Sequence, residues 1–406
     1  MAKIDDSIKK KVPELRFKGF TDDWEQRKLT EIVNRVNKSS NSDVLPKVEF
    51  EDIVSGEGRL NKDISSKFDS RKGTLFEPEN ILYGKLRPYL KNWLFSDFEG
   101  VALGDFWVFE ATDVSVPSFD YYLIQSDNYQ KVANDTSGTK MPRSDWKNVS
   151  STDFAIPSKD EQKQIGAFFK QLDNTIVLHQ RRLDLLKEQK KGYLQKMFPK
   201  NGAKVPELRF AGFADDWEER KLSSGLREYT DRVIVEDDKE YYQISVRNNF
   251  GGITLRGSKM GNKIGRKRQA KINLTKYPQT LIFTRQTVEQ GGIGWVDKYC
   301  DGAIVTENMP TISLDTSVFS KYFLTNLFQT RIFYKNAILD NIEGGSAQIA
   351  IHESKFLSST LLFPNLDEQE KIGQFFKQLD DTIDLHQRKL DLLKEQKKGF
   401  LQKMFV

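Results

Sequence analysis

An internal duplication constrains the fold of this chain more than any other feature of its sequence. Residues 11–29 (KVPELRFKGFTDDWEQRKL) return 193 residues further on at 204–222, and residues 160–198 return 207 residues further on at 367–405. The copies of each segment are nearly identical, whereas the stretches between them barely match. Self-similarity on this scale indicates one structural frame used twice with different contents. The second interior must hold the 14 extra residues by which 207 exceeds 193.

The longer repeated segment has the pattern of a long helix with one apolar seam. Its seam residues recur at alternating steps of four and three, which is the heptad spacing of a coiled coil. The predicted seam positions are Ile165, Phe169, Leu172, Ile176, His179, Leu183 and Leu186 in the first copy and Ile372, Phe376, Leu379, Ile383, His386, Leu390 and Leu393 in the second. Because such a helix is marginal alone in water, we expect the two copies to pair with each other.

Histidines occupy the same seam position in both copies, at His179 and His386. One interpretation is a metal site or a pH-sensitive contact between the helices. The other is a pair of polar seam residues that fix the register of the helices. Because no cluster of acidic or cysteine ligands accompanies them, we favour the second interpretation and predict no metal site.

The two interiors contain short apolar strands broken by Gly, Pro, Asn and Asp, with helical stretches at 119–132 and 319–333. This mixture predicts compact α+β modules. Weak sequence similarities, such as that between ILYGKLRPYL from Ile81 and LIFTRQTVEQ from Leu281, indicate that the modules share a fold. We therefore predict two globular α/β modules separated by two long helices. The predicted segments are 1–158, 159–200, 201–365 and 366–406.

Composition limits the class of protein. The chain has 406 residues, of which 38% are hydrophobic, and we see neither an apolar run of membrane-spanning length nor a secretory signal. We expect a cytoplasmic protein of two or three domains. The single Cys300 cannot form an internal disulfide, and three histidines are too few for a structural zinc site.

Motifs for catalysis are missing from the sequence. There is no Asn-Pro-Pro-aromatic run of a base-flipping methyltransferase and no G-x-x-x-x-G-K-[ST] loop of a motor ATPase. Asp184, Glu188 and Lys190 have a spacing that a metal-dependent nuclease could use, but they flank the heptad seam, where charge is normally solvated. His352 is the only histidine outside the repeats, and no G-x-S-x-G elbow accompanies it. We expect a chain with no catalytic residues.

Positive charge is concentrated in the second module, between residues 256 and 276, where no acidic residue occurs. The cations of this stretch are Arg256, Lys259, Lys263, Arg266, Lys267, Arg268, Lys271 and Lys276. Three glycines make the stretch flexible enough to follow a DNA backbone, where each neutralised phosphate adds affinity. The alternative is a solvated loop without a ligand.

In the first module, the matching cations are Lys85, Arg87 and Lys91. Lys85 aligns with Arg285 at the end of an apolar strand, so each module presents a long cation suited to guanine or phosphate. The cations of the first module alternate with aromatic residues that we expect in the core, namely Tyr83, Tyr89 and Trp93.

Two further loops carry side chains of the kinds that read base edges. The predicted contact residues are Thr139, Lys140 and Arg143 in the first module and Ser346, Gln348 and His352 in the second. They differ between the modules, as readers of different sequences would. Ordinary surface loops are the alternative interpretation.

Taken together, the repeats and loops resemble the specificity subunit of Type I restriction-modification enzymes over essentially the whole chain. The resemblance is carried by VPELRF and a following W-E-x-R-K-L after Val12 and Val205, by GKLRPYL at Gly84, and by DEQ-x-x-IG at Asp160 and Asp367. The second module departs from GKLRPYL at residues 284–290, so individual contact residues transfer poorly to it.

The resemblance implies two target-recognition domains separated by two helices that pack as an antiparallel coiled coil with pseudo-two-fold symmetry. It implies a non-catalytic subunit that recognises a bipartite, asymmetric target in double-stranded DNA. It also implies two methyltransferase subunits as partners and, through them, two motor-nuclease subunits. The partners would carry S-adenosylmethionine, ATP and Mg, whereas this chain would hold no cofactor. The rival hypotheses are a coiled-coil scaffold that never binds DNA and a fused nuclease or methylase.

Overall fold

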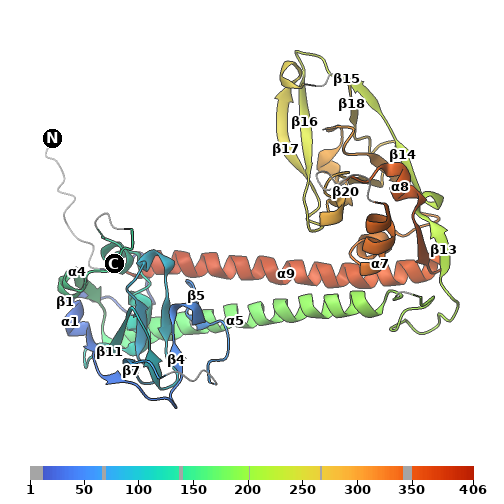
Figure 1. Ribbon diagram of the computed structural model, residues 1–406. Coiled ribbons are helices and arrows are strands. Elements are labelled where there is room, and N and C mark those ends of the chain that lie inside the picture. Colours follow the sequence, from blue (N-terminus) through green and yellow to red (C-terminus); the bar gives the residue numbers. More distant parts are fainter. Residues whose placement is uncertain (1–11, 66–69, 137–139, 201, 266–267, 342–349) are drawn as a thin grey trace. The chain divides into compact units, whose positions relative to one another are not determined.

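A computed structural model describes residues 12–65, 70–136, 140–200, 202–265, 268–341 and 350–406 of the chain. Packing divides the chain into two compact units. Unit 1 comprises Met1–Arg181 and Gln387–Val406, and unit 2 comprises Arg182–His386. The two long helices α5 (Lys159–Lys196) and α9 (Leu366–Met404) therefore each contribute one part to either unit (Figure 1). None of the described helices has the length and apolar character needed to cross a membrane.

Unit 1 contains a mixed α+β module. Its short helices are α1 (Leu29–Ile32), α2 (Pro117–Leu123), α3 (Asp127–Ala133) and α4 (Trp146–Ser151). Its strands are β1 (Glu25–Lys28), β2 (Val33–Val36), β3 (Ser39–Ser40), β4 (Lys47–Val48), β5 (Ile53–Val54), β6 (Arg59–Leu60), β7 (Gly73–Phe76), β8 (Ile81–Gly84), β9 (Trp93–Phe95), β10 (Gly100–Ala102), β11 (Phe106–Ala111) and β12 (Asp153–Ile156). They form two four-stranded sheets, β2-β11-β8-β9 and β3-β7-β10-β4, and the pairs β1-β12 and β5-β6.

Unit 2 repeats this mixture. Its short helices are α6 (Lys321–Leu327), α7 (Arg331–Phe333) and α8 (Glu353–Ser358). Its strands are β13 (Glu218–Lys221), β14 (Leu226–Tyr229), β15 (Arg232–Ile234), β16 (Glu240–Val246), β17 (Ile253–Met260), β18 (Arg268–Lys271), β19 (Thr280–Phe283), β20 (Ile293–Trp295), β21 (Ile304–Val305), β22 (Thr311–Leu314) and β23 (Thr360–Phe363). They form the sheets β14-β22-β19-β20 and β15-β18-β21-β16-β17 and the pair β13-β23.

One sheet is common to the two modules, which confirms the expected α+β fold with a repeated frame. The order β2-β11-β8-β9 in unit 1 corresponds to β14-β22-β19-β20 in unit 2, and all pairs in both sheets are antiparallel. The second sheet differs, because unit 2 adds the long edge strand β17 to a five-stranded sheet. The modules therefore differ most in the strands that lie outside the shared frame.

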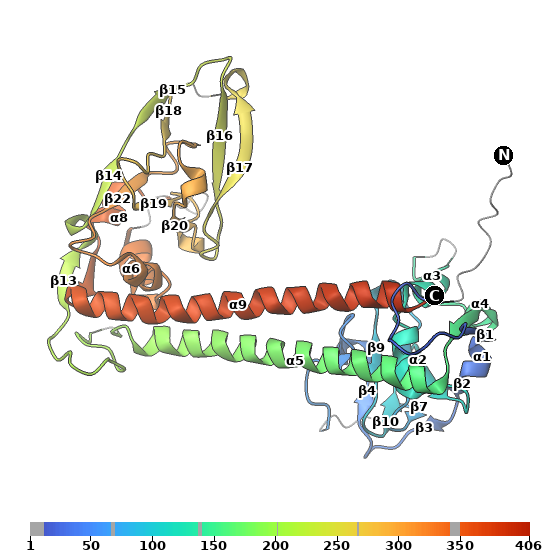
Figure 2. The same cartoon turned by 180° about the vertical axis from the view of Figure 1, so that it is seen from behind.

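Within each unit, parts of α5 and α9 lie side by side and run antiparallel (Figures 1 and 2). In unit 1 the rings of Phe168 and Phe400 are 5.1 Å apart, and Lys397 Nζ lies 2.8 Å from an Asp173 carboxylate oxygen. Unit 2 repeats both contacts. There the rings of Tyr193 and Phe375 are 5.0 Å apart, and Lys190 Nζ lies 2.7 Å from Asp380. The two sets of contacts are related by the 207-residue offset of the duplication.

The predicted heptad seam is the least exposed stripe of the two helices. Eight of its positions are buried, namely Ile165, Phe169, Leu183, Leu186, Ile372, Phe376, Leu390 and Leu393. The other six predicted seam positions, which include His179 and His386, are half-buried. The ends of the seam also pack against the modules. In unit 1 the ring of Phe169 stacks on that of Tyr122 in α2 at 4.9 Å.

The shorter repeated segment, residues 11–29 and 204–222, forms a backbone hydrogen bond to a long helix in both units. In unit 1, Leu15 N donates to Lys403 O at 2.9 Å, and in unit 2, Leu208 N donates to Lys196 O at 2.8 Å. The C-terminal end of α9 then enters the core of the module in unit 1, and that of α5 enters the core of the module in unit 2. The rings of Phe405 and Trp24 are 6.3 Å apart, and those of the equivalent Phe198 and Trp217 are 6.1 Å apart. Each module therefore completes its core with the end of the helix that follows the other module.

The glycine of the DEQ-x-x-IG motif allows a close approach of two helices. A Cβ atom on Gly166 of α5 would lie 2.2 Å from Ser118 Oγ of α2. On Gly373 of α9 it would lie 2.8 Å from the backbone N of Phe323 in α6. No side chain fits at such separations, so glycine is required where each module packs on its long helix.

Both predicted helical stretches are helical in the structure, but each is divided into two helices. The stretch 119–132 forms parts of α2 and α3, and the stretch 319–333 contains α6 and α7. Ser126 and Thr330 cap the second helix of each pair by accepting hydrogen bonds from Tyr129 N and Phe333 N. A capping hydroxyl starts a new helix at both positions, which divides the predicted helix in two.

Candidate nucleic-acid interface

Each module places a cation just after the same strand of its shared sheet. Lys85 follows β8, and Arg285 follows β19 after one intervening residue. Lys85 O accepts a hydrogen bond from Ser144 N at 2.8 Å, and Arg285 O accepts one from Ile351 N at 3.0 Å. The two cations thus hold equivalent positions, and each lies beside the loop that leads to the last strand of its module.

In unit 1 the structure brings three of the predicted contact residues together. Leu86 forms a β-bridge with Arg143. The backbone N of Arg87 donates to Pro142 O at 2.7 Å. Lys85, Arg87 and Arg143 therefore lie on adjoining backbone, although residues 88–142 separate them in the sequence.

An acid that the sequence did not indicate lies next to two of these cations and offsets part of their positive charge. Asp105 lies 2.8 Å from Arg143 Nη2 and 3.7 Å from Lys85 Nζ. The hydrogen bond to Asp105 raises the pKa of the Arg143 guanidinium. Nothing in the sequence marks this acid, because it lies 38 residues from Arg143 and reaches it only through the fold. The pairing orients Arg143 while leaving half of its side chain exposed.

The aromatic residues of this segment do not share one environment. Tyr83 and Trp93 are buried as expected, but Tyr89 is 56% exposed, so its assignment to the core is wrong. Tyr89 lies in a 3₁₀ turn, Pro88–Leu90, between Arg87 and Lys91, which both have left-handed backbone (φ 48° and 55°). This turn directs the ring outward between two exposed cations. An exposed ring beside cations can stack on a base or pack on a sugar.

In unit 2 the equivalent cation is largely neutralised. Arg285 Nη2 lies 2.6 Å from Glu353, and Nε donates to the same carboxylate at 2.9 Å. Burial raises the pKa of the neighbouring Glu228, the Glu353 charge adds to this rise, and Arg285 opposes it. Arg285 therefore holds α8 onto the shared sheet, and its contact with DNA stays a prediction.

The cationic stretch of unit 2 contains an edge strand where the sequence suggested a flexible loop. Arg256 and Lys259 lie on β17 at the edge of the five-stranded sheet, and Lys263 lies in the 3₁₀ turn that follows. All three are exposed, and none forms a salt bridge with another described residue. We call these three residues the edge cations. Helices α6 and α7 lie next to α9, and the sheet of β16 and β17 extends beyond them (Figures 1 and 2).

The remaining predicted contact residues are placed only in part. Thr139, Arg266, Lys267, Ser346 and Gln348 lie outside the described residues, and the side chain of Arg268 in β18 does too. Lys140 and His352 are exposed, and His352 immediately precedes α8. Lys91 is exposed but lines a cavity beside the long helices of unit 1.

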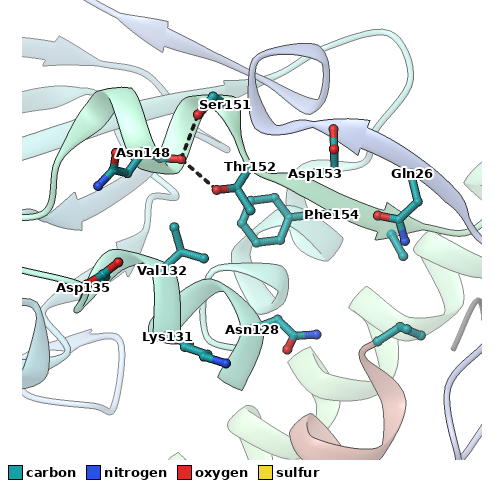
Figure 3. Close-up of a pocket in the computed structure, with 12 residues that line it drawn as sticks. Gln26, Asn128, Lys131, Val132, Asp135, Asn148, Ser151, Thr152, Asp153 and Phe154 are labelled. Carbon is teal, nitrogen blue, oxygen red and sulfur yellow. Dashed lines mark hydrogen bonds between the residues drawn. The ribbon is translucent and has the colours of Figure 1, made fainter. Parts of the chain in front are cut away.

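A cavity of about 910 Å³ in unit 1 is lined by α3, α4 and β12 (Figure 3). Its hydroxyls are already engaged, because Ser151 Oγ and Thr152 Oγ1 donate to the carbonyl oxygen of Asn148 at 3.3 and 2.7 Å. Lys190 of the suspected nuclease triplet pairs with Asp380. Among the described residues, no three His, Cys, Asp or Glu side chains gather in a way that could hold a metal ion.

Comparison with known proteins identifies the repeated architecture. The family model described as "Type I restriction modification DNA specificity domain" matches residues 21–188 and 215–395. The specificity subunit of the Type I restriction enzyme MjaVIII from Methanocaldococcus jannaschii is 24% identical over 300 residues, which cover 70% of this chain and 68% of that protein.

Solved structures share the fold. The S subunit of a Type I restriction-modification system from M. genitalium aligns over 97% of this chain and 99% of its own, with a TM-score of 0.61 and 13% identity. A chain from a study of complex assembly and conformational transition of the type I R-M system covers 93% of this chain and 96% of its own, with a TM-score of 0.52 and 16% identity. The chain belongs to the family of DNA specificity subunits of Type I restriction-modification systems, which are non-catalytic.

Proposed function

We propose that each unit reads one half of a bipartite, asymmetric target in double-stranded DNA. The observation that carries this proposal is a shared frame with unlike contact surfaces. Unit 1 presents Arg87, Tyr89 and Arg143 around the end of β8, whereas unit 2 presents the edge cations on β17. Phosphate contacts from such cations position a protein on DNA, and differing side chains at the bases give differing sequence preferences.

We also propose that the long helices bind the methyltransferase subunits. Large apolar side chains stay exposed at equivalent positions of the two copies. Leu178 is 67% exposed and its copy Leu385 is 64% exposed, while Leu185 and Leu392 are 48% and 51% exposed. Leu178 and Leu185 lie seven residues apart on α5, and so do their copies on α9. The two leucines of each helix therefore share one face. Exposed apolar stripes of this kind favour protein docking.

The docking hypothesis has a direct test. Leu178→Glu and Leu385→Glu, made together, should abolish co-purification of the methyltransferase subunits with this chain. Asp184→Asn and Asp391→Asn change charge at exposed positions on a different face of the same helices and should leave the complex intact. Retention of the complex by the leucine variant would contradict docking on this face.

In this proposal the chemistry belongs to partner subunits. The methyltransferase subunits would supply S-adenosylmethionine, and two motor-nuclease subunits bound through them would supply ATP and Mg. The assembly would act in the cytoplasm, where the chromosome is. No residue of this chain is assigned a catalytic role.

The proposed function is tested by mapping methylated adenines in cells with and without the gene. Deletion should remove one two-part motif with unlike halves and leave other methylation unchanged. The scaffold hypothesis predicts that the reconstituted complex lacks tight, salt-sensitive, sequence-selective DNA binding. An unchanged methylation map would contradict the proposed function.

A further inference from the structure

Each unit has a cavity beside the same lysines of its repeated helix. In unit 1 a cavity of about 380 Å³ is lined by Lys394, Lys397, Lys398 and Leu401 of α9. In unit 2 a cavity of about 920 Å³ is lined by their copies in α5, which are Lys187, Lys190, Lys191 and Leu194. The turn before α3 or α7 forms part of the wall in both units. The two cavities are therefore equivalent places in the duplicated frame.

In unit 1 the module itself supplies an anion to this place. Glu57, in the turn between β5 and β6, accepts a hydrogen bond from Lys394 Nζ at 2.8 Å. Arg59 Nε donates to the same carboxylate at 2.7 Å. Asp127 and Asp173 also line the cavity, so three acids face its five cations. The lysines of unit 1 thus already hold a carboxylate from their own chain.

The equivalent cavity of unit 2 lacks this internal anion. Six cations line it, with Glu207 as its only acid, and that acid pairs with Lys200 at 2.5 Å. Lys190 pairs with Asp380, but Lys187, Lys191 and Arg331 have no salt bridge with another described residue. Arg331 stands where unit 1 has Asp127, because both residues follow the capping hydroxyl of the second short helix.

The walls of the unit 2 cavity indicate the kind of anion. Leu194, Phe198 and Ile332 line it together with the cations. Phosphates of a DNA backbone have no apolar groups for such walls, whereas a peptide with both acidic and apolar side chains has them. The occupant of the equivalent place in unit 1 is a carboxylate rather than a phosphate. Charge and shape together favour an acidic peptide.

We propose that this cavity of unit 2, the basic pocket, binds an acidic, partly apolar peptide segment of a partner protein, while in the equivalent cavity of unit 1 Glu57 already pairs with Lys394. The chain would then take one such segment at the basic pocket, although its frame is duplicated. This proposal goes beyond DNA recognition and does not depend on it.

The experiment measures binding of two probes to the full chain. One is a short fluorescein-labelled peptide of alternating glutamate and leucine, and the other is a short DNA duplex of random sequence. Lys187→Glu with Lys191→Glu, and separately Arg331→Asp, should weaken peptide binding by about tenfold or more while duplex binding stays unchanged. Arg331→Asp copies the residue of unit 1, so it is the milder test of the same pocket.

A matched control carries the same charge change away from the pocket. Lys170→Glu with Lys389→Glu alters exposed lysines of the two helices and should leave peptide affinity unchanged. A peptide with glutamine in place of glutamate should bind the native chain weakly. Circular dichroism checks that each variant is folded. Equal losses in pocket and control variants, no loss at the pocket, or a loss confined to the duplex would each overturn the proposal.

Discussion

At the scale of single residues, arginines of the repeated segments pair with buried acids, whereas the cations proposed to contact DNA are exposed. Arg16 donates two hydrogen bonds to Glu161 at 2.7 and 2.8 Å, and Arg209 binds Glu368 through the same two nitrogens. Both carboxylates are almost fully buried, with 1% and 0% of the side chain exposed. The sequence alone could not separate such cations from DNA-binding ones, because the partner acid is distant in the chain.

Removing one of these arginines should destabilise its unit strongly. Arg16→Ala leaves the buried Glu161 without its counter-charge, which typically lowers the free energy of unfolding by about 3–5 kcal/mol. Urea unfolding followed by tryptophan fluorescence measures the loss. Lys163→Ala breaks the exposed pair with Asp160 and should cost no more than about 1 kcal/mol. Similar losses in both variants would contradict the structural role of the buried pair.

A buried acid should make the stability of unit 1 depend on pH. Burial raises the pKa of Asp120 well above its usual value, and a hydrogen bond from Ser115 Oγ at 2.6 Å opposes this only in part. Because the folded pKa is raised, the neutral carboxyl is favoured on folding, and its stabilising contribution is lost as pH rises through the folded pKa. Asp120→Asn should remove this part of the loss of folding stability at higher pH.

Urea unfolding at a series of pH values above about 4 tests this expectation. Unit 2 has the neutral Leu324 at the equivalent helical position, so the site tolerates an uncharged side chain. Exposed Asp97→Asn serves as the control and should leave the pH profile unchanged. The same slope in native chain and Asp120→Asn would refute the argument.

At the scale of elements, regular patterns could be predicted and irregular ones could not. The repeated segments 160–198 and 367–405 agree with α5 and α9 to within two residues, because one heptad pattern runs through each helix. The outward turn of Tyr89 escaped prediction, because left-handed backbone at Arg87 and Lys91 leaves no sequence signal in non-glycine residues. The edge strand β17 escaped as well, since its pairing with β16 depends on the sheet.

The edge cations should supply affinity without sequence preference. Replacing Arg256, Lys259 and Lys263 together by alanine should weaken binding of the assembled complex to specific and random DNA alike. The slope of log K against log salt should become shallower by about 0.9 for each phosphate that the variant no longer neutralises. Titrations over a range of salt concentrations provide the measurement. An unchanged slope, or a change of preferred sequence, would show that these residues do not act through phosphates.

At the scale of the whole molecule, the duplication explains why the chain has two modules and one frame. Each unit is completed by a helix end from the other half of the chain, as Phe405 and Phe198 show. The four segments read along the sequence differ from the two compact units for this reason. The sequence could indicate the frame, because its copies match, but the contact surfaces depend on interiors that barely match.

If the helices set the distance between the half-sites, their length should set the unread spacer. Inserting one heptad at equivalent positions of α5 and α9 adds roughly 10 Å of helix. We expect the spacer to lengthen by up to about three base pairs, with both half-sites unchanged. Mapping of methylated adenines reads this directly. Changed half-sites around an unchanged spacer would contradict the helices' role as a ruler.

The central claim is that two independent readers share one duplicated frame. Replacement of residues 31–157 by the corresponding module of another specificity subunit tests it most directly, with methylated adenines mapped in cells that carry the native or the exchanged chain. We predict that one half of the two-part motif changes, while the other half keeps its sequence. A change in both halves, or in neither, would contradict the account.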